Sequence, residues 1–336
     1  MNKRFKMSEP SQVLLFNDKN PLEENAIRVI YLDVKQHPLA YRDFKVSSTL
    51  ISTSGLEETF TRKIAIDAID NMAPGVIISL TRKITVCEQK ILKSLEEKLA
   101  LSGTKLLEIF YENREAGYTT SWRADDVVGV ITSEDELSKS GKSLVSSFIE
   151  GTWNEGGELD NSIGKGIESQ IKSTITSSYD FINEKDIEKV SRLLDEMSSY
   201  DVEHAVVAGF KGRRLVGLVE VAKGSINSAI VDALVVFKRV REMKADGFML
   251  IHNHPSGTPT PSKEDILLTM RLSSASKVLG VNFIDSMIVG GKCLPTNVGG
   301  LQNIYKYKNE ILSSAPKHPI KTERQQQVDK RKPISN

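Results

Sequence analysis

Two histidines separated by one residue are the side chains best suited to chemistry in this chain. His252 and His254 follow the apolar run Phe-Met-Leu-Ile, which predicts a buried strand. Side chains two positions apart on a strand point to the same side of a sheet, so both imidazoles can reach one ion. Ser262 begins the next predicted helix, and Asp265 falls in its first turn, where the helix dipole favours an ionised carboxylate.

Two neutral imidazoles and one carboxylate are a ligand set of catalytic zinc sites, which leave a fourth position for water. We therefore expect one Zn²⁺ ion, with His252, His254 and Asp265 as its ligands. The ion would lower the pKa of the bound water to near neutrality from ~15.7 in bulk, and a base must then move the proton. Glu220 is the expected base, because a charged residue is otherwise unexplained in the apolar segment Val-Gly-Leu-Val-Glu-Val.

Each of these residues also has a structural interpretation. A Ser-x-x-Asp segment before an apolar run is an ordinary helix cap. Single histidines are more often hydrogen-bonded or surface residues than ligands, which is the expectation for His37, His204 and His318. Glu220 taken alone could be a solvated residue on an edge strand. The combination of His-x-His after a buried strand with a capping Ser-x-x-Asp shortly afterwards favours the metal site.

The surrounding sequence predicts the elements that position this site. They are strands at 206–208 and 215–221, a helix at 229–244, a strand at 248–251, a helix at 263–279 and a strand at 282–289. A similar order occurs earlier, with a helix at 57–72, a strand at 76–78, a helix at 87–101 and a strand at 105–111. We interpret this as one α/β unit present twice, offset by roughly 175 residues. The alternative is that any two strand–helix–strand segments look this similar.

Composition divides the chain into five expected parts. They are a flexible lead-in (1–25), a first α/β unit (26–118), a Ser-, Gly- and Glu-rich linker or insertion (119–182), a second unit (183–302) and a basic flexible tail (303–336). Within the second unit, Asn183 is expected to cap the first helix.

Charge and cysteine content narrow the classes of function. A net charge of +1 gives no electrostatic reason to expect binding to nucleic acid, although it does not exclude it. No run approaches the ~18 apolar residues of a membrane span, and no apolar segment of a signal peptide follows the basic N-terminus. The two cysteines lie far apart, which favours a reducing cytoplasm over a disulfide framework.

The spacing His252-x-His254-x7-Ser262-x-x-Asp265 resembles the JAMM signature. The segment His-Asn-His-Pro-Ser-Gly, followed by Pro-Ser and Asp, resembles the RadC-like branch of the JAB/MPN family over about residues 206–301. The resemblance implies a cytidine-deaminase-like α/β fold, with a mixed β-sheet flanked by helices. It implies a zinc metallopeptidase or isopeptidase in which His252, His254 and Asp265 bind Zn²⁺. Glu220 would be the acid/base, and Ser262 would hydrogen-bond the developing oxyanion.

The first unit resembles the same domain without its chemistry. Ser79 and Thr81 stand where the histidines are expected, and Glu88 or Gln89 replaces the aspartate. We therefore expect a metal-free copy that packs against the second unit as an intramolecular pseudo-dimer; the alternative is two independent units on a linker. The family usually has a histidine at position 286, where this chain has Ser286, and this difference concerns substrate contacts more than metal binding.

Two functions follow as hypotheses. The first is a zinc-dependent hydrolase that cleaves peptide or isopeptide bonds in a protein or peptide substrate, ubiquitin-like proteins included. The alternative is a non-enzymatic RadC-like module, associated with DNA maintenance or with binding of a protein partner. The helix-hairpin-helix region that precedes the JAB domain in typical RadC proteins is not visible here, which removes the usual reason to expect DNA binding.

Overall fold

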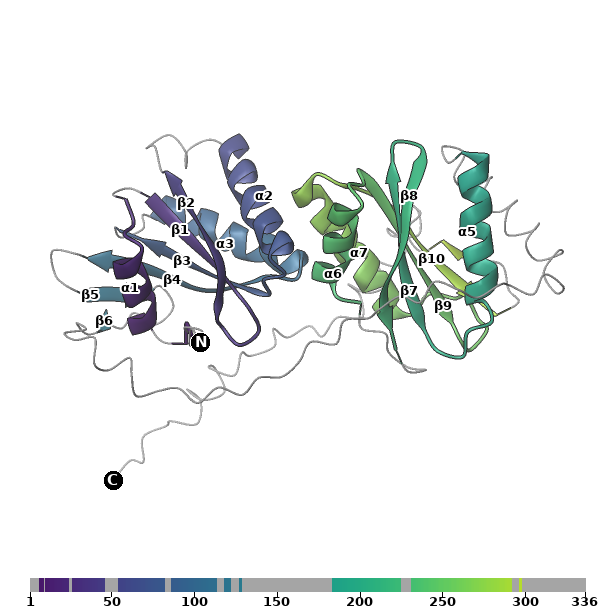
Figure 1. The fold of residues 1–336 in the computed structure, drawn as a ribbon, viewed down its shortest axis with the longest axis horizontal. Coiled ribbons are helices and arrows are strands. Elements are labelled where there is room, and N and C mark those ends of the chain that lie inside the picture. The colour runs from purple at the N-terminus through teal and green to yellow at the C-terminus, as the bar shows by residue number, and fades with distance from the viewer. Residues whose placement is uncertain are drawn as a thin grey trace, which may run out of the picture.

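A computed structural model shows two α/β units side by side (Figure 1). It describes residues 6–8, 10–23, 26–45, 54–81, 86–113, 118–121, 127–128, 183–224, 231–291 and 296–297. The expected linker and C-terminal tail lie almost entirely outside the described residues. No helix among those described is long and apolar enough to cross a membrane.

The first unit is built on a sheet whose strands follow the order β2-β1-β3-β4-β5-β6. Its elements are α1 (Pro10–Lys19), β1 (Ala26–Leu32), β2 (Pro38–Lys45), α2 (Ser54–Asp70), β3 (Gly75–Leu80), α3 (Val86–Leu101), β4 (Lys105–Asn113), β5 (Tyr118–Ser121) and β6 (Val127–Val128). Helix α1 falls within the segment that we expected to be a flexible lead-in. It is ordered because Val13, which is buried, packs with Ile30 and Phe110 on one face of the sheet.

The second unit is built on a sheet whose strands follow the order β11-β10-β9-β7-β8. Its elements are α5 (Glu184–Met197), β7 (His204–Lys211), β8 (Arg214–Lys223), α6 (Ala233–Glu242), β9 (Gly247–His254), α7 (Lys263–Leu279), β10 (Asn282–Gly290) and β11 (Thr296–Asn297). Asn183 caps α5 as expected, because its side chain accepts a hydrogen bond from the Asp186 amide. Helix α7 has the predicted bounds, 263–279.

The two sheets share one topology. In each, an antiparallel hairpin (β1–β2, β7–β8) is followed by a strand antiparallel to its first member (β3, β9) and then by a parallel strand (β4, β10). A glycine with positive φ follows the last helix of each unit, Gly103 after α3 at 92° and Gly280 after α7 at 71°. Glycine adopts this conformation without strain, and it ends a helix. The expected mixed α/β fold in two tandem units is confirmed, whereas a common origin of the units stays a prediction.

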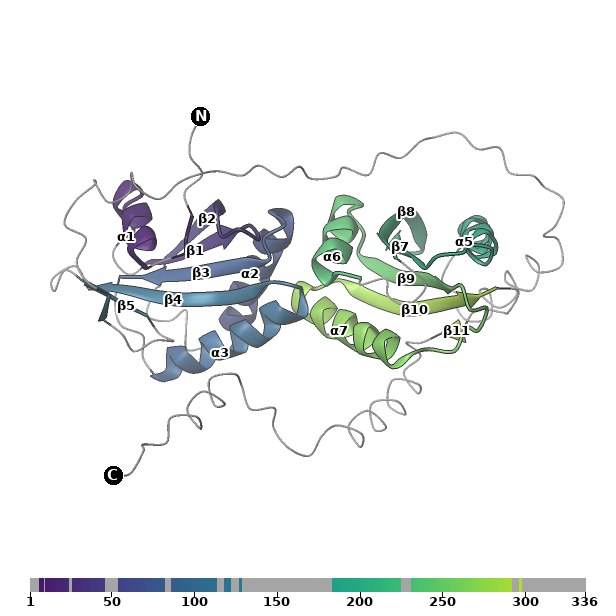
Figure 2. The same cartoon turned by 90° about the horizontal axis from the view of Figure 1, so that it is seen from below.

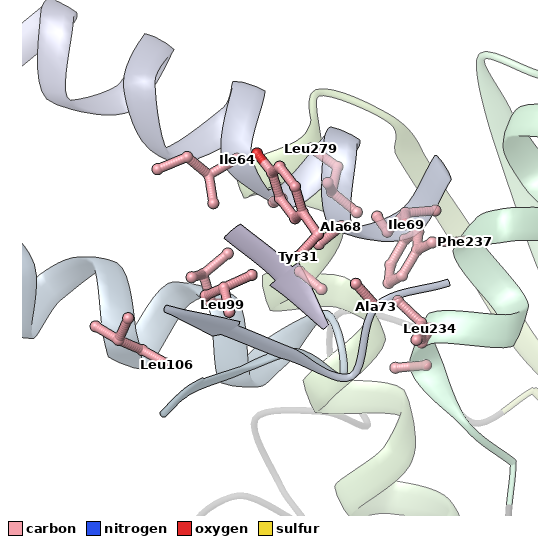
Figure 3. Packing of buried hydrophobic residues seen from close by; sticks show 14 of the residues in the cluster. Tyr31, Ile64, Ala68, Ile69, Ala73, Leu99, Leu106, Leu234, Phe237 and Leu279 are labelled. Atoms are coloured by element: carbon pink, nitrogen blue, oxygen red, sulfur yellow. The ribbon is translucent and has the colours of Figure 1, made fainter. Parts of the chain in front are cut away.

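Helices cover both faces of each sheet. Helix α1 lies on the outer face of the first sheet, and α5 lies on the outer face of the second (Figure 1). Helices α2, α3, α6 and α7 meet between the two sheets (Figure 2). One apolar core runs from sheet to sheet through these four helices, and it includes Ile69 and Leu99 of the first unit and Phe237 and Leu279 of the second (Figure 3).

Polar contacts accompany this shared core. Arg241 on α6 makes two hydrogen bonds to the Asp70 carboxylate at the end of α2, at 2.6 and 2.7 Å. Arg271 on α7 donates to the Leu101 carbonyl at the end of α3, and Arg62 on α2 donates to the Val278 carbonyl at the end of α7, both at 3.0 Å. Cations at helix C-termini are favourable because the carbonyl ends of helices carry partial negative charge.

Candidate metal centre

Strand β9 delivers both histidines to one place. It lies between β7 and β10, and its residues 248–251 are completely buried. His252 pairs with Ala205, whose side chain belongs to the core between the sheets, so His252 lies on that inner face. His252 is buried and His254 is half-buried. Their Nε2 atoms are 3.2 Å apart, which places the two imidazoles around one point as expected.

Asp265 reaches the same point from the first turn of α7. Its Oδ1 is 3.0 Å from Nε2 of His252, and its Oδ2 is 3.4 Å from Nε2 of His254. Burial alone would raise the pKa of Asp265, but hydrogen bonds from the two imidazoles outweigh it and hold the pKa well below its usual range. The same carboxylate raises the pKa of His254 above its ordinary value. Asp265 is therefore ionised at neutral pH and can bind a cation.

Ser262 holds Asp265 in this orientation. Its side chain caps α7 by accepting from the Asp265 amide, and its own amide and hydroxyl donate to Oδ2 of Asp265 at 2.7 and 2.6 Å. This reciprocal arrangement is a capping box. Both readings of the Ser-x-x-Asp segment thus apply together, because the helix cap also orients the carboxylate. The expected contact of Ser262 with a developing oxyanion stays a prediction.

The loop after β9 orients His254. Nδ1 of His254 lies 3.0 Å from the Thr258 carbonyl, which accepts a hydrogen bond when Nδ1 carries a proton, and this contact directs Nε2 toward Asp265. This loop crosses the end of β10 at Gly290. A Cβ atom on Gly290 would lie 2.5 Å from the Pro259 nitrogen and 2.7 Å from the Gly257 carbonyl oxygen. Only glycine therefore lets the loop lie this close to the sheet.

The spacing of the three donor groups fits a tetrahedral ion. Zinc bound at about 2.0–2.1 Å keeps its ligand atoms about 3.3–3.4 Å apart, and the three groups approach each other at 3.0, 3.2 and 3.4 Å. The lone pairs on these atoms repel unless a proton or a cation lies between them. Nδ1 of His252 is buried without a hydrogen-bond partner among the described residues. The donor set therefore suits one divalent metal ion.

A fourth group, Glu203, joins this cluster and was not expected from the sequence. Donor atoms of Glu203, His252, His254 and Asp265 all lie within 4.8 Å of one another. Glu203 immediately precedes β7. Because β7 and β9 are antiparallel, the start of β7 lies beside the end of β9, where the histidines are. This pairing is the signal that could have identified Glu203, had the strand order been known.

Glu220 occupies a different face of the sheet. It pairs with Val206, whose side chain packs in the α5-side core, and paired residues on neighbouring strands share a face. Its carboxylate accepts a hydrogen bond at 2.7 Å from Nδ1 of His204, whose ring packs at a tilt against that of Tyr200. The structure therefore brings together His252, His254 and Asp265 but places Glu220 on the opposite side of the sheet from them.

The equivalent place in the first unit has a leucine. Gly75 begins β3 and pairs with Leu32 near the end of β1, as Gly247 begins β9 and pairs with Phe210 near the end of β7. The strand registers therefore align Gly75 with Gly247. Five residues on, Leu80 then stands level with His252, one place away from the alignment expected from the sequence. Ser79 faces α1 instead, where its hydroxyl accepts a hydrogen bond from Asn17. Residues 82–85 and the side chains of residues 86–90 lie outside the described part, and these include Glu88 and Gln89.

The second unit is similar to known proteins. Residues 184–297 match the family model of the RadC-like JAB domain. A UPF0758 protein of Caldanaerobacter subterraneus is 36% identical over 118 residues, which are 35% of this chain and 47% of that protein. A UPF0758 protein of Syntrophomonas wolfei is 38% identical over 109 residues, and one of Moorella thermoacetica is 40% identical over 99; these cover 32% and 29% of this chain and 46% and 43% of the relatives.

The second unit thus belongs to a defined class of mixed α/β domains. Residues 184–297 form a RadC-like JAB domain. The matched segment lies entirely within the second unit, and the chain spans less than half the length of these curated relatives.

Proposed function

We propose that the second unit is a metal-dependent hydrolase of the JAMM type, which cleaves peptide or isopeptide bonds with a single Zn²⁺ ion. The observation that carries this proposal is the convergence of two imidazoles and two carboxylates within 4.8 Å at the end of a buried strand. Membership of the JAB family supports a hydrolase, and the ligand chemistry supports zinc. When bound, the ion would supply an activated water and polarise the scissile carbonyl.

The chain's own residues divide the remaining work. His252, His254 and Asp265 hold the ion, and Ser262 fixes the second oxygen of Asp265. Glu203 is our choice of base because its carboxylate lies among the ligand atoms, where it can take a proton from water and pass it to the leaving amine. Glu220, the base expected from the sequence, is less suited because it faces α5 and binds His204.

The first unit is proposed to be a metal-free copy of the same domain. Strands β1 to β4 are arranged as β7 to β10 are in the second unit, and Leu80 replaces the first histidine. The apolar core that joins the units supports an intramolecular pseudo-dimer in which the first unit packs against α6 and α7 and stabilises them. A protein or peptide substrate and a cytoplasmic location complete the proposal.

A parallel test of two variants decides the base. The zinc-loaded full chain is assayed with amide and isopeptide substrates, including ubiquitin-like proteins joined to lysine, beside Glu203→Gln and Glu220→Gln. At saturating Zn²⁺ we expect Glu203→Gln to remain metal-loaded and to lose turnover by about 10²–10⁴-fold, while Glu220→Gln stays near the parent.

The opposite pattern would restore Glu220 as the base. Equal turnover in the parent, in Glu203→Gln and in His252→Ala would show that the metal site takes no part in the reaction. Absence of hydrolysis in the zinc-loaded parent across this panel would count for the alternative, a non-enzymatic module that binds a partner.

A further inference from the structure

The residue between the two histidines has a side chain that the metal site does not use. Asn253 is 1% exposed. Because neighbours on a strand alternate, its side chain leaves the sheet away from His252 and His254. Its Oδ1 accepts a hydrogen bond from the His204 amide at 2.7 Å, and its Nδ2 donates to the Val202 carbonyl at 3.0 Å.

These two hydrogen bonds bracket Glu203. One involves the residue before it and the other the residue after it, and the Glu203 carbonyl itself accepts from the Gly224 amide at 2.9 Å. Residues 202 and 203 precede β7, so the strand ladder does not hold them. The backbone that carries the Glu203 carboxylate is therefore fixed largely from outside, by Asn253 and Gly224.

The carboxamide of Asn253 suits both contacts. Its oxygen accepts from an N–H group and its nitrogen donates to a carbonyl, so the orientation of the amide is also determined. An aspartate would face the Val202 carbonyl with an oxygen. An alanine would leave a buried amide and a buried carbonyl without these partners, which costs stability.

We infer that Asn253 is a positioning residue for Glu203, which ties the proposed base to the strand that carries the metal ligands. A single three-residue segment, 252–254, would then fix the positions of both the ion and the base. The distance between them would not depend on flexible side chains elsewhere. This inference rests on the proposed function, because it gives Asn253 a role through Glu203.

The test uses Co²⁺ as a spectroscopic probe of the full-length chain. Co²⁺ affinity and the pH dependence of its visible spectrum are measured for the parent, Asn253→Ala, Glu203→Gln and the double variant. Asn17→Ala is the matched control, because Asn17 is also a buried asparagine with two side-chain hydrogen bonds, to Ser79 and Arg28 in the first unit. Hydrogen exchange at the His204 amide directly reports its hydrogen bond to Asn253.

We expect Asn253→Ala to weaken Co²⁺ binding about tenfold, as loss of an outer partner of a metal site does. Glu203→Gln should weaken it similarly and shift the spectral pH midpoint in the same direction. The double variant should be no worse than either single variant, since both changes remove one interaction. The His204 amide should exchange faster in Asn253→Ala, and Asn17→Ala should leave all site measurements at parent values.

Additive losses in the double variant would show that Asn253 does not act through Glu203. An Asn253→Ala protein that matches Asn17→Ala in every measurement would also overturn the inference. Both outcomes differ from failure of the proposed function itself, in which Co²⁺ binds His252→Ala as tightly as it binds the parent.

Discussion

The two units share the arrangement of their first four strands, but among the described residues donor atoms converge only at the end of β9, and not at the end of the matching strand β3. Strand β9 ends in His252 and His254, whereas the matching position of β3 is Leu80, which is buried and apolar. Both strands pack on the same central core and follow the same connections. The first unit therefore adopts this arrangement of strands with an apolar residue at the position of His252.

The difference also concerns the groups behind the ligands. In the second unit, Ser262, Thr258 and Asn253 are hydrogen-bonded to Asp265, to His254 and to the backbone beside Glu203. In the first unit, the buried polar groups serve packing, as Arg28 does by pairing with Asp43 and Asn17. A site of this kind requires partners for its ligands as well as the ligands themselves.

The largest expected effect concerns the core that the two units share. Phe237 is 1% exposed and packs edge-to-face against Phe248. Phe237→Ala should destabilise the protein by about 3–5 kcal/mol, because it removes a buried ring and leaves a cavity. Chemical denaturation followed by hydrogen exchange should show loss of protection in both β3 and β9.

Leu267→Ala is the control for this change, since Leu267 is 44% exposed and should cost less than about 0.5 kcal/mol. If β9 lost protection while β3 kept it, the units would unfold independently. They would then share an arrangement of strands but no common stability.

The second effect tests the loop that follows β9 in the second unit. Gly290→Ala should weaken metal binding about 10–100-fold, because the added Cβ pushes the loop away and breaks the contact of Thr258 with His254. Competition with a chelator measures the affinity. Gly212→Ala is the control, since nothing lies within 4 Å of its Cβ and only its positive φ is strained. Unchanged metal affinity in Gly290→Ala would show that the loop does not contribute to metal binding.

A third effect comes from pH. Metal binds the neutral imidazole, and Asp265 raises the pKa of His254, so protons compete with the metal from a higher pH than for an ordinary histidine. Below the pKa of His254, each unit of acidification should weaken metal binding by about tenfold. Metal titrations between about pH 5 and pH 7, with circular dichroism to monitor folding, measure this. A pH-independent affinity in the folded protein would argue against His254 as a ligand.

The smallest effect concerns the polar contact between the units. Arg241 and Asp70 form a two-bond ion pair whose side chains are 35% and 42% exposed. Asp70→Asn should therefore cost less than about 1 kcal/mol of unfolding free energy, with a smaller loss in high salt. Glu188→Gln, which breaks the exposed pair with Arg192 within α5, is the reference. A loss above about 2 kcal/mol in Asp70→Asn would exceed an exposed pair's range and would make this contact a principal bond between the units.

Sequence alone predicted the main elements of the second unit and the convergence of three candidate side chains, because each depends on local patterns. The apolar run before His252 specifies a strand, and Ser262 and Asp265 specify the start of a helix. Glu203 could not be found in this way, because its place follows from the antiparallel pairing of β7 with β9, which no local pattern encodes. Glu220 was chosen for being charged in an apolar strand, and the β-bulge between Ala205 and Val206 fixes the face on which it lies.

The central claim is that His252, His254 and Asp265 bind one divalent ion in the second unit. Elemental analysis of the full chain, purified without chelators from zinc-supplemented medium, tests it beside His252→Ala and Asp265→Ala. The account predicts one equivalent of zinc per parent chain and almost none in either variant, with both variants folded by circular dichroism. Zinc at the same level in all three proteins would contradict it, as would a folded parent that holds no metal after direct titration.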